Sequence, residues 1–161
     1  MFLRTASERD LEAVRDLLVE TWHDTYDSIY GAERVKQITD EWHSIPALKT
    51  RLERIDSEFL LADNGEEIAG MAFASAIDGG ATVMLYQLYV RPKHQGRGIG
   101  GLLLDEVEES FPEAVRIRLQ VEEANTKAVA FYLANGFAKM DAASSHKDAV
   151  IYERPLPRSI V

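Results

Sequence analysis

A mixed β-sheet flanked by helices, in the α+β class, is the architecture predicted for this chain of 161 residues. Apolar residues recur at helical spacing through its first third. Short apolar runs then alternate with the turn sequences Asn64-Gly65 and Asp78-Gly79-Gly80, which indicate strands joined by tight turns. A strand, a glycine-rich loop, a helix and another strand follow over residues 82–121. This order predicts a right-handed βαβ unit with two parallel strands.

The first third predicts one strand and three helices. Ser7 suits the N-cap of the first helix, Gly31 interrupts the chain before the second, and Pro46 suits the first turn of the third. The expected ranges are a strand at residues 2–5 and helices over about 8–22, around 35–42 and from 46 onward.

The remaining two thirds predict strands on both sides of two helices. Pro112 ends the first of these helices, and Gly136 ends the second. In the first helix Leu102, Leu103 and Leu104 are expected to face the core. The strands are expected at residues 59–62, 68–77, 82–90, 115–121, 137–140 and 149–153, and the helices at about 98–110 and 125–135.

Length and composition exclude several classes of protein. A chain of this length fits a single domain, residues 1–161. The absence of cysteine excludes a thiol nucleophile and a cysteine-ligated metal or iron–sulfur site, and we expect no metal. A net charge of −9 argues against a general nucleic-acid partner. No apolar run approaches a membrane span and no signal-peptide pattern opens the chain, so a cytoplasmic protein without a membrane partner is expected.

The charge is unevenly distributed along the chain. Residues 79–104 contain no acidic residue and three basic ones, Arg91, Lys93 and Arg97, whereas both flanking segments are acidic. A buried strand accounts for the apolar part of this segment, but it does not account for the basic, glycine-rich part that follows. The segment is therefore a candidate site for an anion.

The glycine-rich loop lies between a strand and a helix. Its sequence has four glycines within residues 96–101. Glycine lets the backbone approach a ligand closely, and the first turn of a helix offers unpaired N–H groups to an anion. A tight turn built only for packing is the structural alternative. The glycines, the helix start and the basic surroundings together favour phosphate binding.

Two nucleotide-binding motifs resemble this loop only in part. Gly96, Gly98 and Gly101 match the spacing of a dinucleotide-binding loop, and Glu122 follows the next strand. Too few β-α units follow for a doubly wound sheet, and the preceding strands read as hairpins. The P-loop pattern fails because Leu102 and Leu103 stand where a lysine and a hydroxyl residue are needed.

Two longer motifs occur in this part of the sequence. The first is Gln/Arg-x-x-Gly-x-Gly/Ala after Val-x-Pro, which reads Gln95-Gly96-Arg97-Gly98-Ile99-Gly100 after Val90-Arg91-Pro92. The second is Asn-x-x-Ala-x-x-Phe-Tyr-x-x-x-Gly-Phe, here residues 125–137. Both motifs resemble those of the GNAT N-acetyltransferase superfamily, and the order of elements is similar to that family over nearly the whole chain. The resemblance implies a GNAT-like acyl-CoA N-acyltransferase fold with splayed parallel strands 82–90 and 115–121.

The resemblance also implies the cosubstrate and its contacts. Acetyl-CoA is expected to place its pyrophosphate on the N–H groups of residues 96–101 and its pantetheine arm along the strand end. Asn125 is expected to contact that arm or the neighbouring backbone. Tyr132 is the expected catalytic acid, because its hydroxyl would lie near the thioester sulfur. The implied cofactor-binding residues are Leu88, Tyr89, Val90, Gln95, Gly96, Arg97, Gly98, Ile99, Gly100, Gly101, Asn125 and Tyr132.

The general base and the acceptor stay open at this point. Some members of the family carry a glutamate where this chain has Gln120. Other candidates for a base are Glu20, His23, Tyr86, His94, Glu122, Glu123 and His146, and a water chain would need none of them. A cluster at residues 22–26, with Tyr30, could line an acceptor pocket or only pack helices together.

The expected reaction transfers an acetyl group to a primary amine, either a small molecule or a protein N-terminus. A non-catalytic acyl-CoA sensor is the alternative function. Homodimers are common in the family, so a homodimer is an alternative to a monomer.

Overall fold

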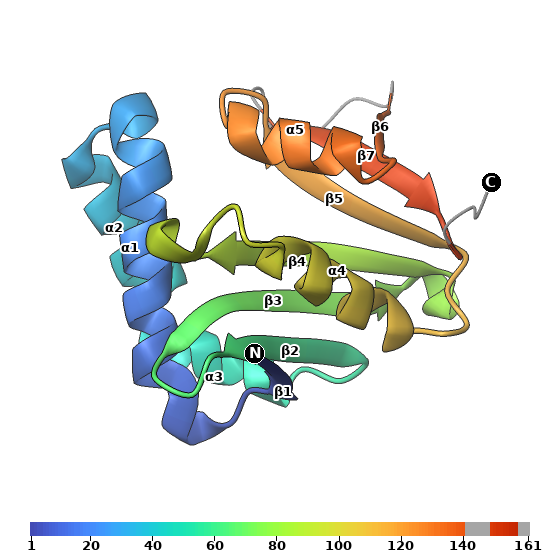
Figure 1. Ribbon diagram of the computed structural model, residues 1–161, viewed down its shortest axis with the longest axis horizontal. Coiled ribbons are helices and arrows are strands. Elements are labelled where there is room, and N and C mark those ends of the chain that lie inside the picture. Colours follow the sequence, from blue (N-terminus) through green and yellow to red (C-terminus); the bar gives the residue numbers. More distant parts are fainter. Residues whose placement is uncertain (141–148, 158–161) are drawn as a thin grey trace.

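The computed structural model describes residues 1–140 and 149–157. In this part of the chain seven strands form one sheet in the order β1-β2-β3-β4-β5-β7-β6 (Figure 1). The strands are β1 (Phe2–Thr5), β2 (Ser57–Asp63), β3 (Ile68–Ile77), β4 (Thr82–Val90), β5 (Arg116–Glu122), β6 (Ala138–Lys139) and β7 (Ala149–Pro155). The helices are α1 (Leu11–Tyr30), α2 (Ala32–Trp42), α3 (Ile45–Glu53), α4 (Ile99–Glu109) and α5 (Thr126–Ala134), with short 3-10 turns at η1 (Glu8–Asp10), η2 (Asp78–Gly80) and η3 (Pro92–His94).

The sheet is mixed, as the sequence predicts. Strands β1 to β4 pair in an antiparallel meander, and β7 pairs antiparallel with both β5 and β6. Among the strands of the described residues, only β4 and β5 run parallel, joined through α4. This confirms the predicted βαβ unit and matches the fold implied by the resemblance.

Helix α1 is longer than the sequence analysis expected. Ser7 precedes η1 in a capping box with Asp10, as predicted, but the helix continues past residue 22 to Tyr30. It ends at Gly31, whose φ of 87° no L-residue adopts readily. Residues 22–30 contain no glycine or proline, so nothing in this stretch ends the helix. The aromatic residues there therefore belong to α1.

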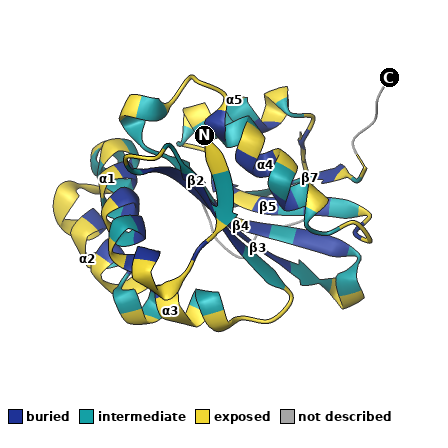
Figure 2. Ribbon diagram, turned by 60° about the horizontal axis from the view of Figure 1, so that its bottom comes forward, coloured by how far each residue is buried: buried dark blue, intermediate teal, exposed yellow. Residues whose placement is uncertain are grey.

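Each face of the sheet has its own core. Helices α1 and α3 pack through Leu17, Leu18 and Leu48 on one face, and their exposed residues point outward (Figure 2). Helix α4 packs through Leu103 and Leu104 on the other face, together with α5. The prediction that Leu102 faces this core is wrong, since its side chain is 46% exposed. Residues three or four apart share a helix face, and the residues that α4 buries are Ile99, Leu103, Leu104 and Val107.

Strands β4 and β5 part halfway along their length. Their pairing runs from Thr82 opposite Arg116 to Leu85 opposite Leu119 and extends no further within the described residues. From there the two strands diverge toward the end of the molecule where α1 lies (Figure 1). The predicted splay of the parallel strands is thus confirmed, and it opens the interior of the sheet.

Candidate active site

A cleft of about 920 Å³ lies where β4 and β5 diverge. The second half of α1 and the N-terminal end of α5 close its sides, and the glycine-rich loop lies at one end. Every residue implied as a cofactor contact lines this cleft except Arg97. The residues that line it come from five segments, 21–29, 85–90, 94–101, 119–122 and 124–132.

A β-bulge in β4 marks the point of divergence. Phe73 of β3 lies opposite Gln87 and Ala74 lies opposite Leu85, so Tyr86 is the extra residue. Bulges sharpen the local twist of a strand and re-aim its side chains. Here the bulge directly follows Leu85, the last residue of β4 that pairs with β5. The rest of β4, residues 86–90, therefore offers an edge to the cleft instead of to a strand.

The glycine-rich loop is shaped to present N–H groups. Gly96 and Gly98 have φ values of 78° and 83°, and Gly98 is the N-cap of α4. Within the described residues, the backbone N–H groups of residues 96–101 donate to no other group of the protein. Several donors and the positive end of the α4 dipole thus meet at one end of the cleft. This geometry suits an anion such as a pyrophosphate.

The positive charge expected around this loop is largely neutralised. Arg91 pairs with Glu20 at 2.6 Å. Lys93 and His94 both contact Glu67, at 2.8 Å and 2.7 Å, and hydrogen bonds from the two lower the pKa of Glu67 to about 2. Arg97 has no acidic partner among the described residues. An anion at this loop would therefore meet the N–H groups and Arg97, and not three unpaired cations.

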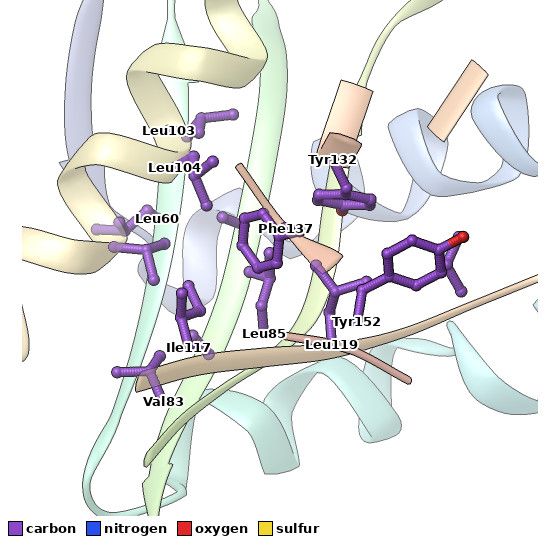
Figure 3. Close-up of a cluster of buried hydrophobic side chains, with 14 of the residues drawn as sticks. Leu60, Val83, Leu85, Leu103, Leu104, Ile117, Leu119, Tyr132, Phe137 and Tyr152 are labelled. Atoms are coloured by element: carbon purple, nitrogen blue, oxygen red, sulfur yellow. The ribbon is translucent and has the colours of Figure 1, made fainter. Parts of the chain in front are cut away.

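Tyr132 lies on α5 between two phenylalanines. Its ring is 5.3 Å from that of Phe131 and 5.5 Å from that of Phe137, both edge to face. Figure 3 shows Phe137 in the middle of the core that α4 covers, with Tyr132 beside it on the side away from Leu103 and Leu104. Burial raises the pKa of Tyr132 well above its ordinary value, and the nearby Tyr26 adds to the rise. Tyr132, which lines the cleft, therefore keeps its hydroxyl protonated and able to donate.

Asn125 connects two sides of the cleft. Its Oδ1 accepts from the N–H of Ala128 at 3.2 Å, which caps α5. Its Nδ2 donates to the hydroxyl of Tyr26 on α1 at 3.4 Å. Burial raises the pKa of Tyr26, and the carboxylate of Glu122 raises it further. Asn125 thus caps its own helix and links it to α1, and its expected contact with the pantetheine arm stays a prediction.

The structure places some candidates for a general base in the cleft lining and others outside it. Glu122, His94, Tyr86 and Gln120 line the cleft. His94 is bonded to Glu67, and the Tyr86 hydroxyl accepts from Arg54 at 3.1 Å. Three candidates lie outside the lining, each with a hydrogen-bond partner: Glu20 with Arg91, Glu123 with Lys139, and His23 with Asp27. His146 lies outside the described residues.

The cluster expected to face an acceptor does so in part. Trp22, Asp24, Thr25 and Tyr26 line the cleft, whereas His23 and Tyr30 do not. The rings of Trp22 and Tyr26 are 4.4 Å apart. Asp24 of α1 and Glu122 of β5 bring two acidic residues to the lining of the cleft. The arrangement suits a cationic guest.

Sequence reasoning missed Gln87. It lines the cleft from β4, although strand 82–90 was read as apolar. The signal was a glutamine where an apolar residue was expected. The direction of the Gln87 side chain depends on the bulge in β4, which no pattern in this sequence predicts.

Two general features of the described residues are also relevant. Residues 1–140 and 149–157 contain no group of three or more His, Cys, Asp and Glu side chains placed to hold a metal ion. In that same part of the chain, no helix has the length and apolar character needed to span a membrane.

Comparison with known proteins yields one family model and several relatives. The model described as the acetyltransferase (GNAT) family matches residues 11–137. A spermidine N(1)-acetyltransferase of Thermoplasma acidophilum is 29% identical over 149 residues, covering 89% of this chain and 91% of that protein.

Solved structures extend the similarity to the whole fold. The crystal structure of PaiA N-acetyltransferase from T. acidophilum in complex with coenzyme A is 28% identical, with a TM-score of 0.89, covering 96% of this chain and 98% of that one. An acetyltransferase from Thermus thermophilus, 24% identical with a TM-score of 0.75, covers 96% of each chain and shares the fold.

Proposed function

The chain belongs to the acetyltransferase (GNAT) family and is an acetyl-CoA-dependent N-acetyltransferase, and we propose that it acetylates a primary amine bound in the cleft between β4 and β5. One observation carries the proposal. The cleft joins an anion-binding loop at one end to the buried, protonated Tyr132 and to a pair of carboxylates. A cofactor with several phosphates and a cationic amine fit these two halves.

The cosubstrate is proposed to lie along β4. The unpaired N–H groups of residues 96–101 and the side chain of Arg97 bind its pyrophosphate. Leu88, Tyr89 and Val90 have no pairing with β5, and this edge of β4 offers main-chain partners to the pantetheine arm. Gln95 closes the loop by donating to the carbonyl of Val90 at 3.0 Å, which keeps loop and strand end together.

The chemistry is a direct transfer in which Tyr132 supplies a proton. Acetyl-CoA provides the acetyl group as a thioester, whose carbonyl carbon forms the new C–N bond as the C–S bond breaks. A strand N–H near Val90 stabilises the negative charge that develops on the carbonyl oxygen. The Tyr132 hydroxyl protonates the departing sulfur. Glu122, which lines the cleft, accepts the proton that the attacking amine gives up, directly or through water.

A polyamine is the proposed acceptor. The relative from T. acidophilum is a spermidine N(1)-acetyltransferase. In this chain Asp24 and Glu122 both line the cleft, and their carboxylates would attract a molecule with several ammonium groups. A protein N-terminus carries a single ammonium and would use one of the two carboxylates. We also propose a cytoplasmic location, where acetyl-CoA and polyamines are both available.

The experiment is a thiol-release assay over a panel of amines. The chain has no cysteine, so a thiol reagent added to protein and acetyl-CoA reports only released coenzyme A. The panel comprises spermidine, spermine, putrescine, an aminoglycoside and a peptide with a free N-terminus. We expect the highest kcat/KM with spermidine or spermine, and a higher KM for both in Glu122→Gln.

Other results would favour other functions. Saturable acetyl-CoA binding without thiol release on any amine would favour the non-catalytic sensor. Thermal stabilisation by NAD(H) but not by coenzyme A would favour dinucleotide binding. Release with the peptide alone would replace the polyamine by a protein acceptor.

A further inference from the structure

The side chain of Gln87 carries a buried acceptor that no group in residues 1–140 and 149–157 satisfies. Gln87 is 8% exposed, and its Oε1 is buried without a hydrogen-bond partner. Leaving a buried carbonyl oxygen unpaired costs free energy, so such groups in native proteins call for a partner. Among the described residues, Ser75 Oγ and both ring nitrogens of His43 are also buried and unpaired, but neither residue lines the cleft. Trp22 lines it and has a buried, unpaired Nε1, but an indole N–H is a donor, so Gln87 supplies the unpaired acceptor.

The bulge in β4 decides which face of the sheet Gln87 occupies. Residues opposite each other in an antiparallel pair share a face. Gln87 lies opposite Phe73, which belongs to the core under α1 and α3, whereas Leu85 lies opposite Ala74 in the core under α4. Gln87 therefore lies on the α1 side, the side of Trp22 and Thr25. The proposed path of the cofactor follows the strand edge and the loop before α4.

We propose that Gln87 binds the acceptor, with its Oε1 accepting an N–H of the amine that attacks the thioester. This inference rests on the proposed function. An amide oxygen is suited to the task because it is not a base at neutral pH. It can hold a neutral amine through one N–H and leave the nitrogen lone pair free for attack, whereas a carboxylate in its place would favour the ammonium form.

The test compares Gln87→Met with Gln87→Glu. Methionine has nearly the shape of glutamine without the acceptor, so it should raise the KM for the amine roughly tenfold. The Kd for acetyl-CoA, measured by titration, should stay within twofold. The melting temperature without ligands should stay the same or rise, because no hydrogen bond of the free protein is lost. A merely structural role for Gln87 would instead lower it.

Gln87→Glu keeps an acceptor oxygen and adds charge. It should bind the amine within a fewfold of the wild-type Kd, while its pH profile of kcat/KM moves to higher pH because the ammonium form is favoured. Gln37→Met is the matched control, since Gln37 lies exposed on α2 outside the cleft lining and its exchange should change none of these quantities.

Failure of this inference can be told apart from failure of the proposed function. An unchanged amine KM in Gln87→Met, with an active wild type, overturns the role of Gln87 alone. A parallel loss of acetyl-CoA affinity also overturns it, since Gln87 would then face the cofactor. If the wild type releases no thiol with any amine, the proposed function fails. Spermidine is then titrated into the CoA-saturated protein, and either an equal Kd for wild type and Gln87→Met or no binding to the wild type overturns the inference.

Discussion

The side-chain amide of Asn125 donates a hydrogen bond of 3.4 Å to the hydroxyl of Tyr26, although the two residues are 99 positions apart in the sequence. Both line the cleft, one from the start of α5 and the other from α1. The same asparagine caps α5 through its Oδ1. One side chain therefore both starts a helix and fixes the spacing of two walls of the site.

Asn125→Ala should lower the free energy of unfolding by about 2 kcal/mol, because it removes the helix cap together with the bond to Tyr26. Asn125→Asp keeps the capping oxygen and loses only the donor, so its loss should be about half as large. Tyr26→Phe removes the same bond from the other side and should match Asn125→Asp. Urea unfolding measures all three. Equal losses for Asn125→Ala and Asn125→Asp would show that the cap contributes nothing.

Tyr132→Phe should lower kcat roughly 100-fold or more, since it removes the proton donor for the departing sulfur. The Kd for acetyl-CoA should change less than twofold. Because burial raises the pKa of Tyr132, the wild type should lose no activity through this group below about pH 10. Tyr152→Phe is the matched control, since Tyr152 is buried outside the cleft lining. Comparable kcat values for wild type and Tyr132→Phe would remove Tyr132 from the mechanism.

Local patterns were enough to predict most of the sheet. Turn residues and alternation placed β2, β3 and β4, and the motif before α4 placed the parallel pair. These signals are local because a tight turn leaves neighbouring strands little choice of partner. Helix α1 was predicted too short, because nothing in its second half marks an end before Gly31.

The electrostatics of the site were harder to predict. Arg91, Lys93 and Arg97 read as one basic island, yet the structure pairs Arg91 with Glu20, 71 positions away, and Lys93 with Glu67. Such pairing depends on how the strands and α1 pack together. The amino-acid composition carries no information about that packing. The bulge that aims Gln87 has the same origin, since it is a property of the β3–β4 register.

Gly98→Ala should weaken coenzyme A binding about tenfold. A Cβ at Gly98 would meet no heavy atom within 4 Å, so the cost is that of holding alanine at a φ of 83°. The loop is expected to relax and turn its N–H groups away from the phosphates. Gly65→Ala is the matched control, because Gly65 has a φ of 91°, equally open surroundings and a place in the β2–β3 turn outside the cleft lining. It should lose similar stability, about 1 kcal/mol, with unchanged coenzyme A affinity by calorimetry. Equal affinities for both variants would contradict a role of the loop in phosphate binding.

His43 should make folding less stable as the pH falls. Burial lowers its pKa from 6.5 to about 3, and the positive charges of Arg51 and Arg15 contribute. The unfolded chain therefore takes up a proton at His43 below pH 6.5, whereas the folded protein does not until about pH 3. Because the unfolded state binds more protons in this window, stability must decrease as the pH is lowered through it, by at most about 1.4 kcal/mol per pH unit from this group.

His43→Phe isolates that contribution. Phenylalanine keeps an aromatic ring near Trp22, whose ring lies 5.4 Å from that of His43, and it cannot titrate. Acid also destabilises the folded protein by protonating carboxylates such as those of Asp10 and Glu67, whose pKa values are lowered by their cationic partners. These carboxylates are common to both proteins. The difference in unfolding free energy between variant and wild type, measured by urea titration at pH 7, 6, 5 and 4, should therefore move steadily in favour of the variant as the pH falls. A difference that stays constant with pH would mean that His43 takes up a proton as readily in the folded protein as in the unfolded chain. Its unpaired, buried ring nitrogens argue against that.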